Sequence, residues 1–139
     1  MAKKFTLVLG LVFLVIGIAG YIPALAPAND HGQLLLHIFQ INTAQSLIHL
    51  VSAAAALLAV GVGGYYVKRY LIVFGVVYTL VALWGITALT GGTHDNVLLG
   101  LVHVNMATEL LHIAIAASTL YFGLRKENAV AVTANATQE

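Results

Sequence analysis

Residues 70–90 read YLIVFGVVYTLVALWGITALT and contain no Asp, Glu, Lys or Arg. A helix needs about 20 such residues to cross about 30 Å of hydrocarbon. Three further apolar runs cover residues 5–22, 33–62 and 97–123. Open strands in lipid would leave backbone groups unpaired, and these runs lack the alternation of a barrel wall. The sequence therefore predicts an all-α integral membrane protein, a bundle of four transmembrane helices.

The composition supports this fold class. Of the 139 residues, 60% are hydrophobic and 8% are charged, whereas a soluble domain carries about 25% charged residues. A chain this short cannot hide so much apolar surface in a water-facing fold, so we expect the lipid bilayer to surround it. The net charge of +1 and the lack of a Lys/Arg-rich patch give no reason to expect nucleic acid as a partner. The absence of cysteine excludes disulfides, iron–sulfur clusters and cysteine-ligated zinc.

The basic residues predict the orientation. All six Lys and Arg occur at three places, which are Lys3-Lys4, Lys68-Arg69 and Arg125-Lys126. In a chain of four spans these places lie on one side of the membrane, and the positive-inside rule makes that side cytoplasmic. Both chain ends are then cytoplasmic. We expect one transmembrane domain over residues 1–128 and a disordered cytoplasmic tail over residues 129–139, which are small and polar.

The chain also resembles itself. A shift of 63 residues superimposes Asn42 on Asn105 and His49 on His112, and a shift of 65 superimposes Gly10 on Gly75. The pattern predicts two tandem copies of one helical hairpin. Both copies run in the same direction, so a pseudo-two-fold axis along the membrane normal should relate them.

Polar residues recur on one face of the second and fourth spans. Residues seven apart share a helix face, so we expect two such faces to lie opposite one another near mid-membrane. The leading interpretation is a structural polar seam, because Asn and His side chains form hydrogen bonds that hold membrane helices together. The six residues of this predicted seam are Asn42, Ser46 and His49 in the first copy and Asn105, Glu109 and His112 in the second.

Three functional interpretations of the same residues stay open. His49 and His112 could ligate a b-type haem from opposite sides. His49, Glu109 and His112 form a two-histidine, one-carboxylate set that suits a divalent transition metal. A buried histidine or carboxyl group could also accept protons, which would suit proton-coupled transport by an oligomer.

Several of these residues resemble a family of small four-span bacterial membrane proteins catalogued as a domain of unknown function. The resemblance extends over roughly residues 5–123 and implies a bacterial inner or thylakoid-type membrane, with no activity attached. The motifs that carry it are Asn42…His49, Asn105…His112, Arg69-Tyr70 and Gly75-Val76-Val77-Tyr78.

The function expected from the sequence is non-enzymatic. The chain has no Gly-rich phosphate loop, nucleophile elbow or paired carboxylates. Four short spans with small loops leave the lateral surfaces as the main means of action. We therefore expect association with copies of the same chain or with other membrane proteins, and we keep haem or metal binding as the alternative.

Overall fold

The computed structural model describes residues 1–90, 97–98 and 102–125. The helices in this part of the chain are α1 (Ala2–Ala19), α2 (Thr43–Val62), α3 (Gly64–Thr90) and α4 (Met106–Leu124). Short strands form two antiparallel sheets, with the orders β1-β2-β3 and β4-β5. The strands are β1 (Ala28–Asn29), β2 (Gly32–Leu35), β3 (Phe39–Ile41), β4 (Val97–Leu98) and β5 (Val102–His103).

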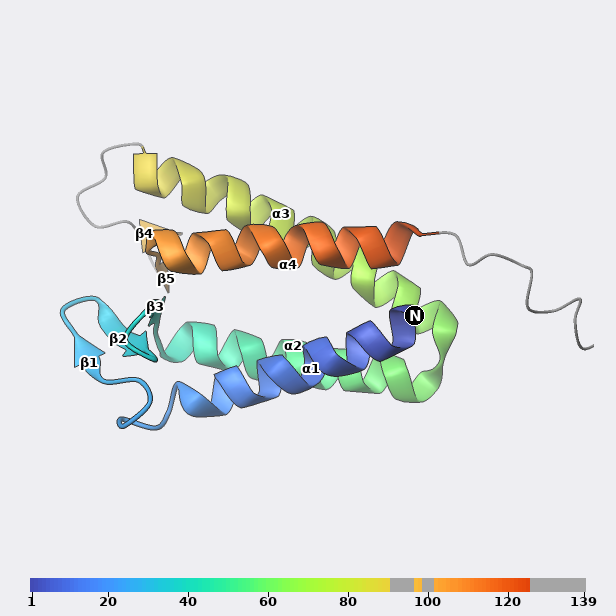
Figure 1. Cartoon of the computed structure of the whole chain (residues 1–139), viewed down its shortest axis with the longest axis horizontal. Coiled ribbons are helices and arrows are strands. Elements are labelled where there is room, and N and C mark those ends of the chain that lie inside the picture. Colours follow the sequence, from blue (N-terminus) through green and yellow to red (C-terminus); the bar gives the residue numbers. More distant parts are fainter. Residues whose placement is uncertain (91–96, 99–101, 126–139) are drawn as a thin grey trace, which may run out of the picture.

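The helices pack as two antiparallel pairs, α1 with α2 and α3 with α4 (Figure 1). The N-terminus, the link between α2 and α3 and the C-terminal end of α4 lie at one end of the bundle. The strands lie at the other end, which we call the strand end. All four helices are long and apolar enough to cross a membrane, as expected of a multi-pass membrane protein.

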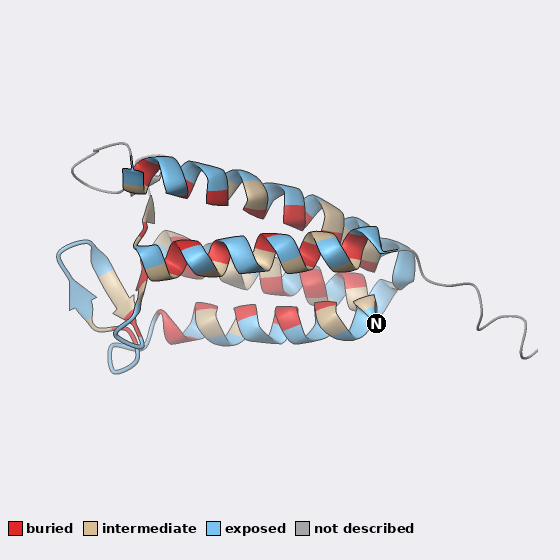
Figure 2. Ribbon diagram, turned by 45° about the horizontal axis from the view of Figure 1, so that its top comes forward, coloured by how far each residue is buried: buried red, intermediate tan, exposed pale blue. Residues whose placement is uncertain are grey.

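Every helix has one buried and one exposed side (Figure 2). The helices α2 and α4 bury mainly small and polar residues, whereas α1 and α3 also bury large apolar ones, and all four expose apolar side chains. In α4 the buried side carries Thr108, Glu109, His112 and Thr119. The outer side carries large apolar residues such as Leu110, which is 60% exposed. This is the reverse of a helix on a water-soluble protein, where the apolar stripe faces the core.

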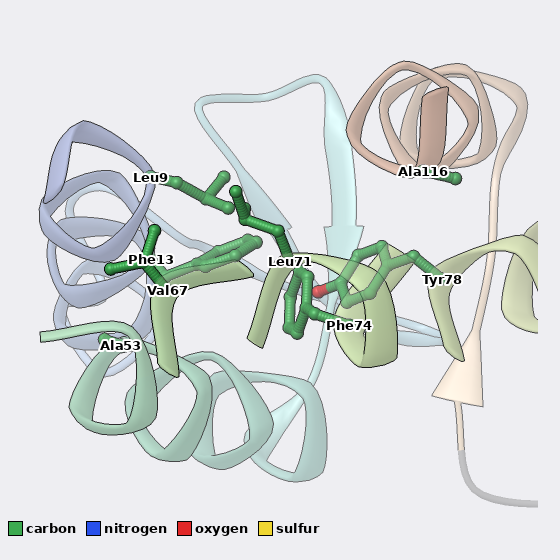
Figure 3. Close-up of a cluster of buried hydrophobic side chains, with 8 residues drawn as sticks. All are labelled: Leu9, Phe13, Ala53, Val67, Leu71, Phe74, Tyr78 and Ala116. Carbon is green, nitrogen blue, oxygen red and sulfur yellow. The ribbon is translucent and has the colours of Figure 1, made fainter. Parts of the chain in front are cut away.

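A cluster of buried side chains joins the two helix pairs near their middle (Figure 3). Phe13 of α1 lies with its ring centroid 5.4 Å from that of Phe74 in α3, and the Phe74 ring lies 4.4 Å from that of Tyr78. Tilted aromatic pairs at such distances add roughly 0.5–1.5 kcal/mol each to burial alone. The cluster consists of Leu9, Phe13, Ala53, Val67, Leu71, Phe74, Tyr78 and Ala116.

Within each pair, a glycine lets the helices approach closely. A Cβ on Gly10 of α1 would lie 3.0 Å from the Ala56 Cβ of α2. A Cβ on Gly75 of α3 would lie 2.8 Å from the Leu120 side chain of α4. Small residues at membrane helix contacts serve this purpose, since the helices gain packing energy only when their backbones come close.

Two predicted spans begin too early, and the fold is mostly helical rather than all-α. Residues 33–62 include β2, β3 and the turn between them, and α2 begins only at Thr43. Residues 97–123 likewise include β4 and β5, and α4 begins at Met106. Leu36 and His37 turn the chain between β2 and β3 with φ of 52° and 62°, a conformation that ends any helix. The predicted tail, residues 129–139, lies outside the described residues.

Candidate functional site

Asn42 and Asn105 cap helices, and so do not lie within them as the seam prediction supposed. The Asn42 side chain accepts a hydrogen bond of 2.9 Å from the backbone N–H of Gln45, and Asn105 accepts one of 2.9 Å from that of Thr108. Such N-cap bonds satisfy backbone donors that the first helical turn leaves free. The Asn105 amide also donates to the Ile38 carbonyl at 2.8 Å, which ties α4 to the turn of the first sheet.

Glu109 lies deep in the bundle and is 1% exposed. Its Oε2 lies 3.4 Å from Nδ1 of His112, one turn further along α4. The carboxyl group packs against Gly85 of α3, where a Cβ would overlap with it. In the first helix pair, Gly20 meets the hydroxyl of Ser46 in the same way. The glycine repeat in the sequence did not reveal that Gly20 and Gly85 make room for polar groups.

The two histidines stand against different aromatic rings. His49 of α2 stacks on Phe13, with ring centroids 5.3 Å apart and planes 14° apart. The ring of His112 meets Tyr78 edge-on, with centroids 5.6 Å apart and planes 82° apart. Each imidazole is therefore held by an aromatic contact to the neighbouring helix.

Both histidines line one cavity of about 100 Å³ towards the strand end of the bundle. Its walls come from α1, α2, α4 and the first sheet, including Leu35, Leu36 and Phe39. Most of the lining is apolar. The polar residues that line it are Gln40, Gln45, His49, Thr108 and His112. The structure thus brings His49 and His112 to a shared space, as the repeat predicted.

Four buried polar atoms of α2 and α4 have no hydrogen-bond partner within the described part of the chain. They are Gln45 Oε1, Ser46 Oγ, His49 Nδ1 and Glu109 Oε1. A buried polar atom without a partner costs about 1–3 kcal/mol, so each one calls for a physical explanation. Of the six predicted seam residues, Glu109 and His112 are joined to each other, whereas both asparagines serve as caps.

The geometry does not favour a haem or a metal ion. Among the described residues, no three His, Cys, Asp or Glu side chains come together to hold a metal ion, so His49, Glu109 and His112 do not form the predicted set. The cavity of about 100 Å³ is also far smaller than the roughly 300–1,000 Å³ of ordinary small-molecule pockets. A haem does not fit between His49 and His112 in this arrangement.

Two lining residues escaped the sequence analysis. Gln45 precedes His49 by four residues and so shares its helix face, a spacing that could have revealed it. Gln40 fell inside a predicted span, and only the structure shows that it belongs to β3 and not to a helix. It donates to the His31 carbonyl at 2.9 Å and exchanges hydrogen bonds with Asn29.

A family model described as Domain of unknown function (DUF4383) matches residues 3–125. The chain belongs to this family. The matched DUF4383 region contains all four helices, both sheets and the whole cavity. No curated protein and no solved structure matches the chain. The family resemblance inferred from the Asn…His motifs is therefore confirmed.

Proposed function

We propose that this DUF4383 protein is a non-enzymatic component of a bacterial inner or thylakoid-type membrane that acts by lateral association with a second copy of itself. The observation that carries the proposal is an open groove between α2 and α3. The groove measures about 430 Å³ and is lined by apolar and aromatic side chains, with Arg69 among them. It lies towards the end of the bundle that carries the N-terminus and the C-terminal end of α4.

The groove exists because the contact between the two helix pairs is less extensive than the contact between the helices within each pair. The α2–α3 contact involves far fewer residues than the α1–α2 or α3–α4 contact. Ala55 and Ala59 line the groove one helical turn apart. This small-xxx-small spacing lets the backbone of a neighbouring membrane helix come close. A second copy can supply the equivalent α2 face, so the contact would be closed and two-fold, as most homodimer interfaces are.

The charge distribution supports a cytoplasmic location for both termini. Lys3 and Lys4 lie at the start of α1, Lys68 and Arg69 near the start of α3, and Arg125 directly after α4. These starts and this end occupy the same end of the bundle (Figure 1). The positive-inside rule then places that end in the cytoplasm and the strand end outside.

We also propose that the chain arose as two tandem copies of one helical hairpin, with short strands between the two helices of each copy. The strand registers agree under the 63-residue shift, since Leu34 pairs with Gln40 in the first sheet and Val97 with His103 in the second. The N-caps Asn42 and Asn105 agree under the same shift. The residues that contact the close-packed glycines also correspond under the 63-residue shift, because Gly10 contacts Leu57 and Gly75 contacts Leu120.

The association is tested with size-exclusion chromatography and multi-angle light scattering in a mild detergent. The wild-type protein should run as a dimer or a higher oligomer. Ala55→Phe fills the groove and should shift the protein towards the monomer. Ala54→Phe is the matched control, because Ala54 is exposed on the same helix but does not line the groove.

Three results would contradict the proposal. The first is a wild-type protein that is monomeric and purifies without any partner. The second is a wild-type monomer bound to a different membrane protein, which would exclude self-association. The third is an Ala55→Phe variant whose mass equals that of the wild type, which would mean that copies meet on another surface.

A further inference from the structure

A second open groove runs along the outer surface of α4, apart from the α2–α3 groove to which we assign association. It measures about 480 Å³. Its lining side chains point away from the bundle, since Tyr121 is 57% and Leu124 64% exposed. Because α4 is long and apolar enough to cross a membrane, this groove faces the lipid. The residues that line it are Ala117, Leu120, Tyr121, Leu124 and Arg125, which are spaced as one stripe on a helix.

The groove ends in a positive charge at the depth of the lipid phosphates. The helix α4 has 19 residues, so it is about 28 Å long at the usual rise per residue. This length matches the hydrocarbon core of a bilayer, which is about 30 Å thick. Arg125 follows α4 directly and lines the groove. Its guanidinium group therefore lies where the hydrocarbon meets the headgroups.

Tyr121 holds the guanidinium group of Arg125 in place. The Arg125 Cζ lies 5.7 Å from the centroid of the Tyr121 ring, and Nη1 donates to the Tyr121 hydroxyl at 3.3 Å. The same Nη1 lies 3.7 Å from Sδ of Met1, a weak acceptor. Both contacts use Nη1, so Nη2 and Nε have no hydrogen-bond partner among the described residues. The donors that remain suit a ligand with two oxygens on one atom.

No carboxylate in the described part of the chain neutralises Arg125. The acidic residues described there are Asp30, between β1 and β2 at the strand end, and Glu109, in the first turn of α4. Glu109 contacts His112. The end of the bundle that carries Arg125 also carries Lys3, Lys4, Lys68 and Arg69 (Figure 1). The charge that complements this end is therefore negative.

We propose that the α4 groove binds one anionic phospholipid, with the phosphate on Arg125 and an acyl chain along Ala117, Leu120 and Leu124. The planar fork of an arginine side chain binds two phosphate oxygens at once. The small Ala117 side chain leaves room for the chain to lie against the helix. A zwitterionic lipid carries the same phosphate, but its own ammonium group competes with Arg125 for it. The site should therefore prefer an anionic headgroup.

Native mass spectrometry of the full chain, released from detergent micelles, tests the proposal. The probes are phosphatidylglycerol, which is anionic, and phosphatidylcholine, which is zwitterionic, with matched acyl chains. The wild-type protein should bind one phosphatidylglycerol more tightly than phosphatidylcholine. Arg125→Gln should weaken the binding of phosphatidylglycerol about tenfold or more, because it removes a charge-assisted contact.

Lys68→Gln is the matched control for charge. It removes one positive charge at the same end of the bundle, but Lys68 lines neither groove. Its affinity for phosphatidylglycerol should stay close to that of the wild type. Equal wild-type affinities for the two lipids would overturn the proposal. Equal losses in Arg125→Gln and Lys68→Gln would also overturn it, because they would mean that the overall charge attracts the lipid.

The acyl chain has a test of its own. Ala117→Phe fills the groove and should weaken the binding of phosphatidylglycerol, whereas Ala114→Phe should not, because Ala114 is exposed on α4 without lining the groove. Glycerol phosphate lacks the chain and should not displace the lipid at equal concentration. Displacement by glycerol phosphate, or unchanged lipid binding in Ala117→Phe, would overturn the proposal. Conversion of an oligomer to a monomer by Ala117→Phe would overturn it too, since a second copy would then occupy the groove.

Discussion

The contact between Glu109 and His112 should behave as an energetically coupled pair. Glu109 is 1% and His112 7% exposed, so bulk water cannot replace the partner that a substitution removes. Glu109 Oε1 has no partner in the described part of the chain, so His112→Leu would leave the whole carboxyl group unpaired. Stranding a buried group in this way costs about 1–3 kcal/mol. The 3.4 Å separation exceeds the usual hydrogen-bond length, so we expect the lower half of that range.

A double-mutant cycle measures this coupling. Glu109→Met keeps the unbranched shape that fits against Gly85 but removes both oxygens, and His112→Leu removes the imidazole. The double variant should lose about 1 kcal/mol less free energy of unfolding than the two single variants lose together. The reason is that the double change removes the stranded group along with its partner. The free energy of unfolding can be followed by titration with a denaturing detergent.

The first helix pair provides an internal control for the cycle. Ser46 and His49 occupy the positions equivalent to Glu109 and His112, but the Ser46 hydroxyl and His49 Nδ1 have no partner among the described residues. The cycle of Ser46→Ala with His49→Leu should therefore show coupling below about 0.3 kcal/mol. Additive losses for Glu109 and His112, or equal coupling in both pairs, would refute the contact as a source of stability.

Substitutions at three further positions follow from local geometry, each measured as a change in the free energy of unfolding. Asn105→Asp keeps the cap acceptor but loses the donor to the Ile38 carbonyl, so it should cost about 0.5–1.5 kcal/mol. Asn105→Ala should cost about 1 kcal/mol more, because the cap is also lost. Equal losses in the two variants would contradict two separate roles for Asn105. His37→Asn should stabilise the protein by about 0.5–1 kcal/mol, because Asn tolerates the φ of 62° better than His does; a loss would show that the turn carries no strain. Gly85→Ala should cost about 1–3 kcal/mol, because the added methyl group overlaps with the Glu109 carboxyl group. The cost should be smaller in a protein that also carries Glu109→Ala. An equal cost in both backgrounds would mean that the methyl group overlaps with another residue.

The number of helices could be predicted from the sequence, and the starts of two of them could not. Hydropathy identifies apolar segments and does not distinguish a helix from a strand. A small sheet with paired backbone groups is nearly as apolar in sequence as a helix, so the strands were included in the predicted spans. The run over residues 33–62 is longer than one span requires, and that surplus was the available sign of an extra element. Asn42 was visible too, but it was interpreted as a group on a helix face although Asn is more favourable as an N-cap.

The site could be predicted only in outline, for a related reason. The shared helix face and the internal repeat were enough to predict that His49 and His112 lie in the same region, and both line one cavity. Which atoms are paired there depends on side chains from other elements, such as Gln40 of β3, whose carbonyl accepts from Thr108. The volume that argues against a haem depends on Leu36, which the turn after β2 directs to the cavity wall.

The two proposed copies agree in their scaffold and differ in the polar layer beside the cavity. Caps, strand register and close-packed glycines correspond between the halves, whereas the equivalent positions carry Gln45 against Thr108 and Ser46 against Glu109 in the sequence. Packing alone gives no reason to place a carboxyl group at one of two equivalent positions, since its burial is costly in a membrane. In the second half Glu109 Oε2 lies 3.4 Å from His112, whereas Ser46 Oγ and His49 Nδ1 of the first half have no partner among the described residues. Whatever the bundle does beyond association should therefore depend on this difference, which Glu109→Ser would remove and exchange of Ser46 and Glu109 would reverse.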